Sequence, residues 1–105
     1  MFSVQHFCPL NIGFNRALKT ANLGQNQIGA KGAAALSEAL KSNNTLETLY
    51  LYTNGIGVAG AQSLANMLQV NRALKYVDLV CNKIPNEAKQ QLRAAAAAKS
   101  ITLKL

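Results

Sequence analysis

The feature that most constrains this sequence is a pattern that returns every 28 residues. The segment Asn15–Lys19 (NRALK) recurs letter for letter as Asn71–Lys75, 56 positions later. A degenerate copy, Asn43–Glu47 (NNTLE), lies halfway between them. Self-similarity at a fixed period of this size indicates a repeat architecture, in which similar units stack on one another.

Further columns keep the same step through three copies. They are Leu23, Leu51 and Leu79; Asn26, Asn54 and Asn82; Ile28, Ile56 and Ile84; and Leu36, Leu64 and Leu92. Chance does not hold this many columns in phase. We expect the asparagine amides to point inward and to pair with backbone N–H and C=O groups at a sharp turn.

Each unit is predicted to contain one strand and one helix. In the central unit, residues 46–51 end in an alternation of apolar and polar side chains, which is typical of a half-buried strand. The segment 54–57 then breaks the chain, and residues 60–68 carry apolar side chains at helical spacing. Stacked units would form a parallel sheet and an outer layer of helices, with the leucines between them.

This pattern resembles the leucine-rich repeat family, in its ribonuclease-inhibitor-like subclass of about 28 residues per repeat. The family pattern L-x-x-L-x-L-x-x-N-x-I-G-x-x-G-A-x-x-L matches residues 46–64 at every defined position. It matches 18–36 and 74–92 with few departures, which are Ala21 in the first and Val77, Pro85, Ala88 and Lys89 in the second. The resemblance implies an α/β solenoid, a horseshoe segment with a parallel sheet on the concave face and helices on the convex face. It also implies that proteins bind on the concave face.

Two segments are expected along the chain. Residues 1–14 fit the repeat poorly, because Pro9 falls where a helix interior should be and would cost about 3 kcal/mol there. They are interpreted either as a frayed tail or as an irregular cap over the first unit. Residues 15–105 should hold three repeats and a terminal strand at 101–105, two residues early against the 28-residue step. Because so short a stack is barely sufficient, a fragment of a longer array is an open alternative.

A glycine motif in the central unit suggests a nucleotide site, but the repeat argues against it. Residues 55–60 (GIGVAG) carry the letters of the dinucleotide-binding fingerprint. In the neighbouring units the first glycine is replaced by Gln27 and Lys83, so it is interpreted as incidental. The other two recur as Gly29 and Gly32, which should serve the turn and close helix packing. We therefore predict no cofactor.

Metal and catalytic chemistry are also predicted to be absent. The only histidine is His6, and the only cysteines are Cys8 and Cys81, whereas soft metals need three or four such ligands. Cys81 shares a column with Gln25 and Thr53 and is interpreted as a small packed residue. With no acid–base or nucleophile constellation, the chain is not expected to be an enzyme.

Cysteine usage and hydropathy predict where the protein resides. Two cysteines are too few for a disulfide framework, so we expect reduced thiols and a cytoplasmic location. No apolar run approaches the roughly 20 residues that a membrane span needs, so no membrane association is expected.

The chain carries a formal net charge of +7, with 11 Lys and Arg against 4 Asp and Glu. Basic residues gather where helices lead into strands; they are Arg16, Lys19, Arg72 and Lys75, with Lys41 and Lys99 near by. Only Glu47 is expected to lie near these residues and offset their positive charge. Three interpretations stay open: a solvated edge, a rim that attracts an acidic protein partner, or a nucleic-acid contact. Few arginines and no interleaved aromatic residues argue against nucleic acid.

Strand alternation predicts the binding surface. If Leu49 and Leu51 face the helices, the side chains between them face the concave side. The candidate partner-binding residues are Thr48, Tyr50, Tyr52, Tyr76, Asp78, Val80 and Lys104. Tyr50 and Tyr76 should be diagonal neighbours, with an exposed Asp78 beside Tyr50.

We therefore predict a non-catalytic protein–protein interaction module that binds its partner on the concave strand face. Tyrosine also suits a strand for purely structural reasons, which is the alternative for these side chains. The alternative for the whole chain is a structural or self-associating repeat segment, because unpaired strand edges template pairing with another chain.

Overall fold

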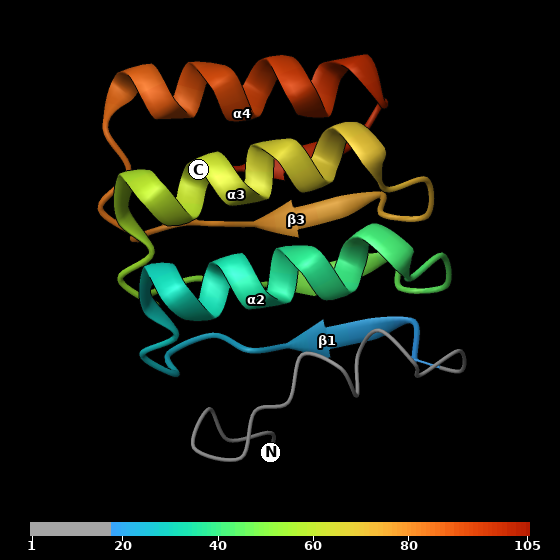
Figure 1. Ribbon diagram of the computed structural model, residues 1–105, viewed down its shortest axis with the longest axis horizontal. Helices are drawn as coiled ribbons and strands as arrows, with labels where there is room; N and C mark the ends of the chain where they lie inside the picture. Colours follow the sequence, from blue (N-terminus) through green and yellow to red (C-terminus); the bar gives the residue numbers. More distant parts are fainter. Residues whose placement is uncertain (1–17) are drawn as a thin grey trace.

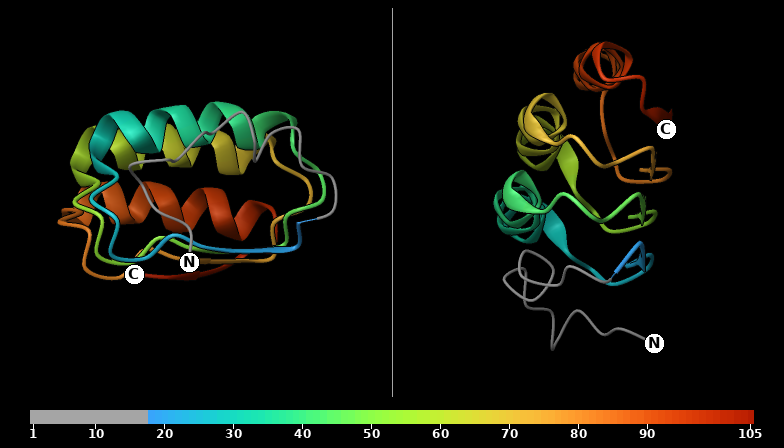
Figure 2. Two further views of the ribbon diagram at one scale, coloured as in Figure 1. Left: turned by 90° about the horizontal axis from the view of Figure 1, so that it is seen from below. Right: turned by 90° about the vertical axis from the view of Figure 1, so that its right-hand side faces the viewer.

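Strands and helices alternate along the part of the chain that the computed structural model describes, residues 18–105 (Figure 1). They are β1 (Thr20–Asn22), α2 (Gly29–Ser42), β2 (Thr48–Tyr50), α3 (Gly57–Val70), β3 (Tyr76–Asp78), α4 (Asn86–Ala98) and β4 (Thr102–Lys104). The strands form one parallel sheet in the order β1-β2-β3-β4, and the helices all lie on one side of it (Figure 2). The predicted α/β solenoid is confirmed. The predicted tail or cap at 1–14 lies outside the described residues.

The strand register follows the repeat. Thr20 pairs with Thr48, and Thr48 pairs with Tyr76, so the paired residues are 28 positions apart in the first two strand pairs. Tyr76 pairs with Thr102, which is only 26 positions further on. The fourth strand does come two residues early, and the shorter connection that includes α4 absorbs the difference before β4 begins.

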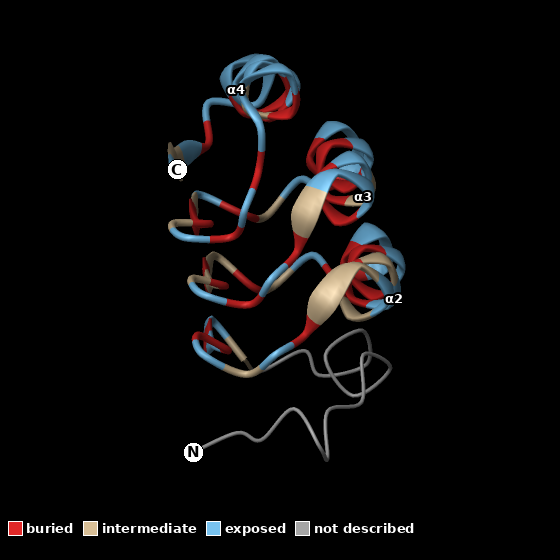
Figure 3. Ribbon diagram, turned by 90° about the vertical axis from the view of Figure 1, so that its left-hand side faces the viewer, coloured by how far each residue is buried: buried red, intermediate tan, exposed pale blue. Residues whose placement is uncertain are grey.

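Leucine side chains fill the space between the sheet and the helices, where Figure 3 shows the buried residues. Leu49 and Leu51 are fully buried, so they do face the helices. The predicted inner columns are all buried: Leu23, Leu51 and Leu79; Ile28, Ile56 and Ile84; and Leu36, Leu64 and Leu92. In α4 a smaller side chain, Ala96, takes the core position that Leu40 and Leu68 hold in α2 and α3.

A glycine permits close packing of α3 on α2. A Cβ at Gly60 would collide with Ile56 Cγ2 and would lie 3.1 Å from Ala33 Cβ and 3.3 Å from Ala30 Cα. Any larger side chain would therefore push the two helices apart. The predicted packing role of this glycine is confirmed.

Asparagine side chains join neighbouring units where each strand turns toward its helix. Asn54 Oδ1 accepts hydrogen bonds from the backbone N–H of Asn26 (2.8 Å) and of Ile28 (3.2 Å). Its Nδ2 donates to the carbonyl oxygens of Leu23 (2.8 Å) and Leu51 (3.0 Å). One buried amide thus bonds the backbone of its own unit and of the unit before it.

Asn82 makes the same connection one unit further along. Its Oδ1 accepts from the N–H of Asn54 at 2.7 Å, and its Nδ2 donates to the carbonyl oxygens of Leu51 (2.7 Å) and Leu79 (3.0 Å). The predicted structural role of this asparagine column is confirmed. We call Asn26, Asn54 and Asn82 the asparagine ladder.

A second asparagine column links the units at the opposite corner, where each helix leads into the next strand. Asn71 Nδ2 donates to the carbonyl oxygens of Leu40 (2.7 Å) and Asn43 (3.0 Å). Its Oδ1 accepts from the N–H groups of Ala73 and Leu74, each at 2.8 Å. The same 28-residue recurrence that marks the asparagine ladder marked this column, although we assigned it no role from the sequence.

The turn after each strand passes through the left-handed backbone region. The φ angle is +60° at Gln25, +56° at Thr53 and +60° at Cys81, and all three side chains are exposed. The interpretation of Cys81 as a packed residue is therefore wrong. The left-handed turn directs this column outward, away from the asparagine side chain that follows it.

A second left-handed position follows two residues later. The φ angle is +54° at Gln27, +62° at Gly55 and +57° at Lys83. Only glycine adopts this conformation without a steric penalty, which is about 1–2 kcal/mol for other residues. Gly55 therefore avoids strain that its two counterparts bear, although the turn forms without glycine in both of them.

Leu51→Ala should lower the free energy of unfolding by about 2–5 kcal/mol, because it empties a fully buried site flanked by a unit on each side. Leu105→Ala should cost far less, since Leu105 is only half-buried and follows the outermost described strand. Urea unfolding followed by circular dichroism measures both. Equal losses would contradict the stacking described here.

Asn54→Ala should lower the free energy of unfolding by at least about 3 kcal/mol, because several buried backbone groups lose their partners at about 1–3 kcal/mol each. Asn26→Ala makes the same chemical change at the half-exposed member of the ladder. It should cost about 1 kcal/mol. If the two variants unfolded at the same urea concentration, the ladder would not hold the units together.

Candidate functional site

One face of the sheet is left open, because all the helices cover the other (Figure 2). Along β2 the burial alternates: Leu49 is buried between the half-buried Thr48 and Tyr50. This alternation and the strand register place the seven predicted site residues together on the uncovered side. We call this side the open face: Thr48, Tyr50, Tyr52, Tyr76, Asp78, Val80 and Lys104.

Two tyrosine rings touch at the centre of the open face. The ring centroids of Tyr50 and Tyr76 lie 5.7 Å apart, and the ring planes are tilted by 59°. Because Tyr50 pairs with Asp78 across the sheet, Tyr76 is its diagonal neighbour, as predicted. A tilted aromatic pair at this separation is mutually attractive, so each ring limits the motion of the other.

The third tyrosine lies over a glycine of the preceding unit. A Cβ placed on Gly24 would collide with the ring of Tyr52. The ring therefore occupies the space that a side chain at position 24 would take. Tyr50 leans toward β3 and Tyr52 toward the unit of β1, so together the rings extend the aromatic surface over three units. Gly24 lies 28 positions before Tyr52, one repeat earlier, but the sequence alone did not identify it as a support for that ring.

Asp78 is buried, with 9% of its surface exposed, and the expectation of an exposed carboxylate is wrong. It lies in register between Tyr50 on β2 and Lys104 on β4, and its Oδ1 accepts a hydrogen bond from the N–H of Val80 at 3.0 Å. Alternation sets the direction of a side chain but not its exposure. Here the longer side chains in register on both sides, Tyr50 and Lys104, and the bond to the backbone of Val80 leave the short carboxylate little contact with solvent.

Part of the basic rim is neutralised. Lys19 Nζ lies 3.8 Å from Glu47 Oε2, where one residue precedes β1 and the other precedes β2. Lys41 Nζ lies 2.7 Å from Glu38 Oε2 within α2. Glu47 is therefore not the only acid that opposes the rim. Arg16 lies outside the described residues.

The remaining rim cations have no acidic partner. Arg72, Lys75 and Lys99 are exposed, and none of them makes an ion pair within residues 18–105. Lys75 directly precedes Tyr76, the first residue of β3, and Arg72 lies three residues before Lys75. These two cations therefore belong to the segment that leads into the strand of Tyr76, at the edge of the open face.

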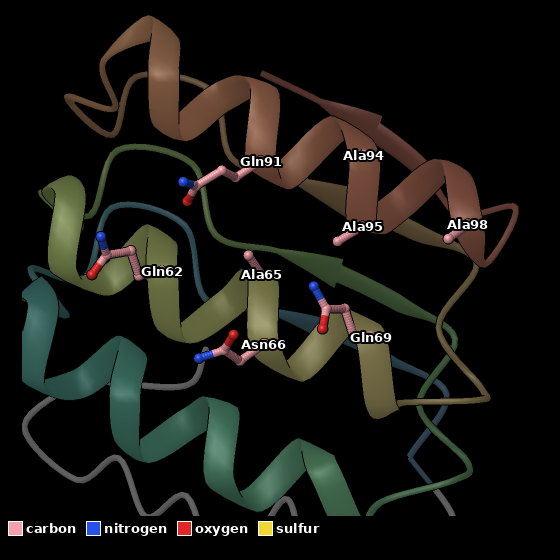
Figure 4. Close-up of a pocket in the computed structure, with 8 residues that line it drawn as sticks. All are labelled: Gln62, Ala65, Asn66, Gln69, Gln91, Ala94, Ala95 and Ala98. Carbon is pink, nitrogen blue, oxygen red and sulfur yellow. The ribbon is translucent and has the colours of Figure 1, made fainter.

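A shallow groove of about 600 Å³ runs between α3 and α4 on the helix side (Figure 4). Its lining comprises Gln62, Ala65, Asn66, Gln69, Gln91, Ala94, Ala95 and Ala98. Alanines form the floor, amides stand at the rim, and no charged side chain takes part. The helical spacing of these residues is visible in the sequence, although we predicted no groove.

The described residues offer little for metal or membrane chemistry. Among residues 18–105, no three His, Cys, Asp or Glu side chains gather closely enough to hold a metal ion. His6 and Cys8, the half-site considered from the sequence, lie outside this range. No helix in the described part of the chain is long and apolar enough to cross a membrane.

Comparison with known proteins supports the leucine-rich repeat family, whose sequence model matches residues 14–37 and 42–65. No significant match was found among curated proteins. Together with the strand–helix units and the parallel sheet, the family match identifies the fold as an α/β leucine-rich repeat solenoid.

Two solved structures share this fold. The tropomodulin C-terminal domain of Caenorhabditis elegans is 18% identical with a TM-score of 0.80, over 91% of this chain and 60% of that one. Leiomodin-1 actin-binding site 2 is 20% identical with a TM-score of 0.83, over 91% of this chain and 58% of that one. This chain therefore spans about 60% of the length of either structure.

Gly24→Ala should displace the Tyr52 ring without unfolding the protein. The added methyl group needs the space that the ring now fills, and a half-exposed side chain can swing away into solvent. NMR of ring-labelled tyrosine should show the Tyr52 signals moving toward those of free tyrosine, while the Tyr50 and Tyr76 signals stay in place. Unchanged Tyr52 signals would show that its ring does not lie on Gly24.

Proposed function

We propose that this leucine-rich repeat solenoid is a non-catalytic module that binds a protein partner on its open face. Tyr50, Tyr52 and Tyr76 are the proposed anchors. One observation carries the proposal: all three tyrosines of the chain lie on the one face that no helix covers, and each is only half-buried.

The surroundings of the tyrosines support a binding role over a purely structural one. The solenoid core is made of aliphatic side chains and one methionine on the other side of the sheet, so it does not use these rings. Their hydroxyl groups make no hydrogen bond within residues 18–105. Half-exposed, mutually restrained tyrosines lose little entropy on binding and are enriched at the energetic centres of interfaces.

Two finer assignments belong to this proposal. The 28-position strand register supports the ribonuclease-inhibitor-like subclass. The low cysteine content supports a cytoplasmic location. One of the similar structures is itself named an actin-binding site, which is consistent with a protein partner for a solenoid of this shape.

Self-association is the second candidate, and the outermost strand favours it. β4 ends the described sheet, and Lys104 is its only charged side chain. Charged side chains on an edge strand hinder its pairing with another chain, and this edge carries only one of them. It is therefore open to pairing with a second copy. Sedimentation velocity over a concentration series separates the two functions: a concentration-dependent dimer supports self-association, and a monomer at all concentrations excludes it.

The combined change of Tyr50→Ala and Tyr76→Ala should leave the fold intact and remove at least about 2 kcal/mol of binding free energy. The probe is a linear peptide selected from a random display library on the immobilised full chain, and calorimetric titration measures its affinity. Circular dichroism and the urea midpoint check the fold.

The matched control is the combined change of Gln62→Ala and Gln69→Ala in the groove between α3 and α4. These substitutions shorten two exposed side chains on the opposite side of the protein, so they should leave peptide binding unchanged. If the control pair removed the binding and the tyrosine pair did not, the site would be the groove rather than the open face.

A further inference from the structure

We infer that the partner is acidic on one side only: its carboxylates lie over the β3–β4 half of the open face, and its uncharged apolar part lies over the β1–β2 half. This inference rests on the proposed function, because it concerns the same surface. It assigns both the chemistry of the partner and the direction in which the partner lies.

The β1–β2 half of the open face is nearly neutral. Lys19, at its edge, lies 3.8 Å from Glu47, so the two charges largely cancel for a distant ligand. The face itself carries Thr48 and Tyr52 here, with Tyr52 lying over Gly24. This half offers hydroxyl groups and an aromatic ring, which suit an uncharged segment.

The β3–β4 half is positive. Arg72 and Lys75 precede β3, Lys104 belongs to β4, and all three are exposed without an ion pair in the described range. Asp78 is the acid within this half; it is 9% exposed, and one of its oxygens already accepts a hydrogen bond from the N–H of Val80. Glu47, whose carbonyl oxygen accepts a hydrogen bond from the N–H of Lys75 at 2.8 Å, directs its carboxylate to Lys19 on the other side. Three cations therefore face solvent with little compensation.

Lys104 lies on the open face itself, and Lys75 lies at its edge, next to Tyr76 in the chain. Lys75 directly precedes Tyr76, and Lys104 is in register with Asp78, two residues further along. Positions 75 and 78 are separated by about 10 Å along a strand, so a partner with two carboxylates can meet both lysines at once. Rings beside a charge also exclude water when a ligand covers them, which strengthens each ion pair.

Exposed charges of this kind act mainly on the rate at which the ligand associates. Exposed cations attract an acidic ligand over roughly a Debye length and raise the association rate, whereas the aromatic anchors govern how long the ligand stays. The two contributions are therefore separable by experiment. Salt should slow association with the wild-type protein and should have less effect on a variant whose lysines are removed.

The test reverses charge on the open face and, as a control, on the helices. Lys75→Glu with Lys104→Glu changes the face, and Lys31→Glu with Arg93→Glu changes two exposed helix positions by the same net charge. Random-peptide display is repeated on both variants and on the wild-type chain. Association rates are then measured with the peptide selected on the wild-type protein.

We expect the wild-type and control proteins to select peptides rich in Asp and Glu, and the face variant to select basic ones. Association of the wild-type peptide with the face variant should be slower by about tenfold or more and should lose most of its salt dependence. The control variant should retain the wild-type behaviour, because its cations lie on the other side of the sheet.

The other outcomes overturn either this inference or the proposed function. Selected peptides that need Tyr50 and Tyr76 but carry no acidic residues would overturn the inference alone. An equally large loss of association rate in the control variant would also overturn the inference, because the effect would then come from the net charge of the protein and not from the open face. Selected peptides whose affinity does not change when both tyrosines are replaced would overturn the proposed function. A single-stranded oligonucleotide that bound more tightly than any selected peptide would replace the protein partner with nucleic acid.

Discussion

The structure depends on satisfying the backbone where each strand turns toward its helix. The turn removes N–H and C=O groups from the sheet ladder while keeping them buried, and such groups are costly without partners. Asn54 and Asn82 supply those partners, each bonding the backbone of its own unit and of the preceding one. A shift of one residue in either unit would break these bonds. The asparagine ladder therefore sets the register of the whole stack.

The register determines what the open face can do. Because units align side chain by side chain, Tyr50 meets Tyr76 on the diagonal and Tyr52 lies over Gly24. Leucines and alanines on the opposite side of the sheet carry the packing of the core. The open face is thus held in place by residues that do not belong to it. Substitutions on it therefore leave in place the contacts that keep the units together.

Sequence periodicity predicted the scaffold well and its finer geometry poorly. The roles of the columns that contain Leu51 and Asn54 could be predicted, because every unit needs the same residue type at these positions. Exposure depends instead on surroundings that differ between units: Asp78 is a short side chain between Tyr50 and Lys104, and its carboxylate is bonded to the backbone of Val80. Cys81 points outward because its backbone is left-handed, and the letters alone do not show a φ angle. The groove between α3 and α4 also escaped prediction, since no charged or aromatic residue marks it.

The claim that the open face is the binding surface can be tested by NMR of the full chain with labelled tyrosine rings and alanine methyl groups. The peptide selected on the immobilised protein is added, and the signals of the two sides are compared. Our account predicts that the ring signals of Tyr50, Tyr52 and Tyr76 shift, while the methyl signals of Ala94 and Ala98 in the groove stay in place. Shifts confined to those alanines, with the tyrosine rings unmoved, would contradict it.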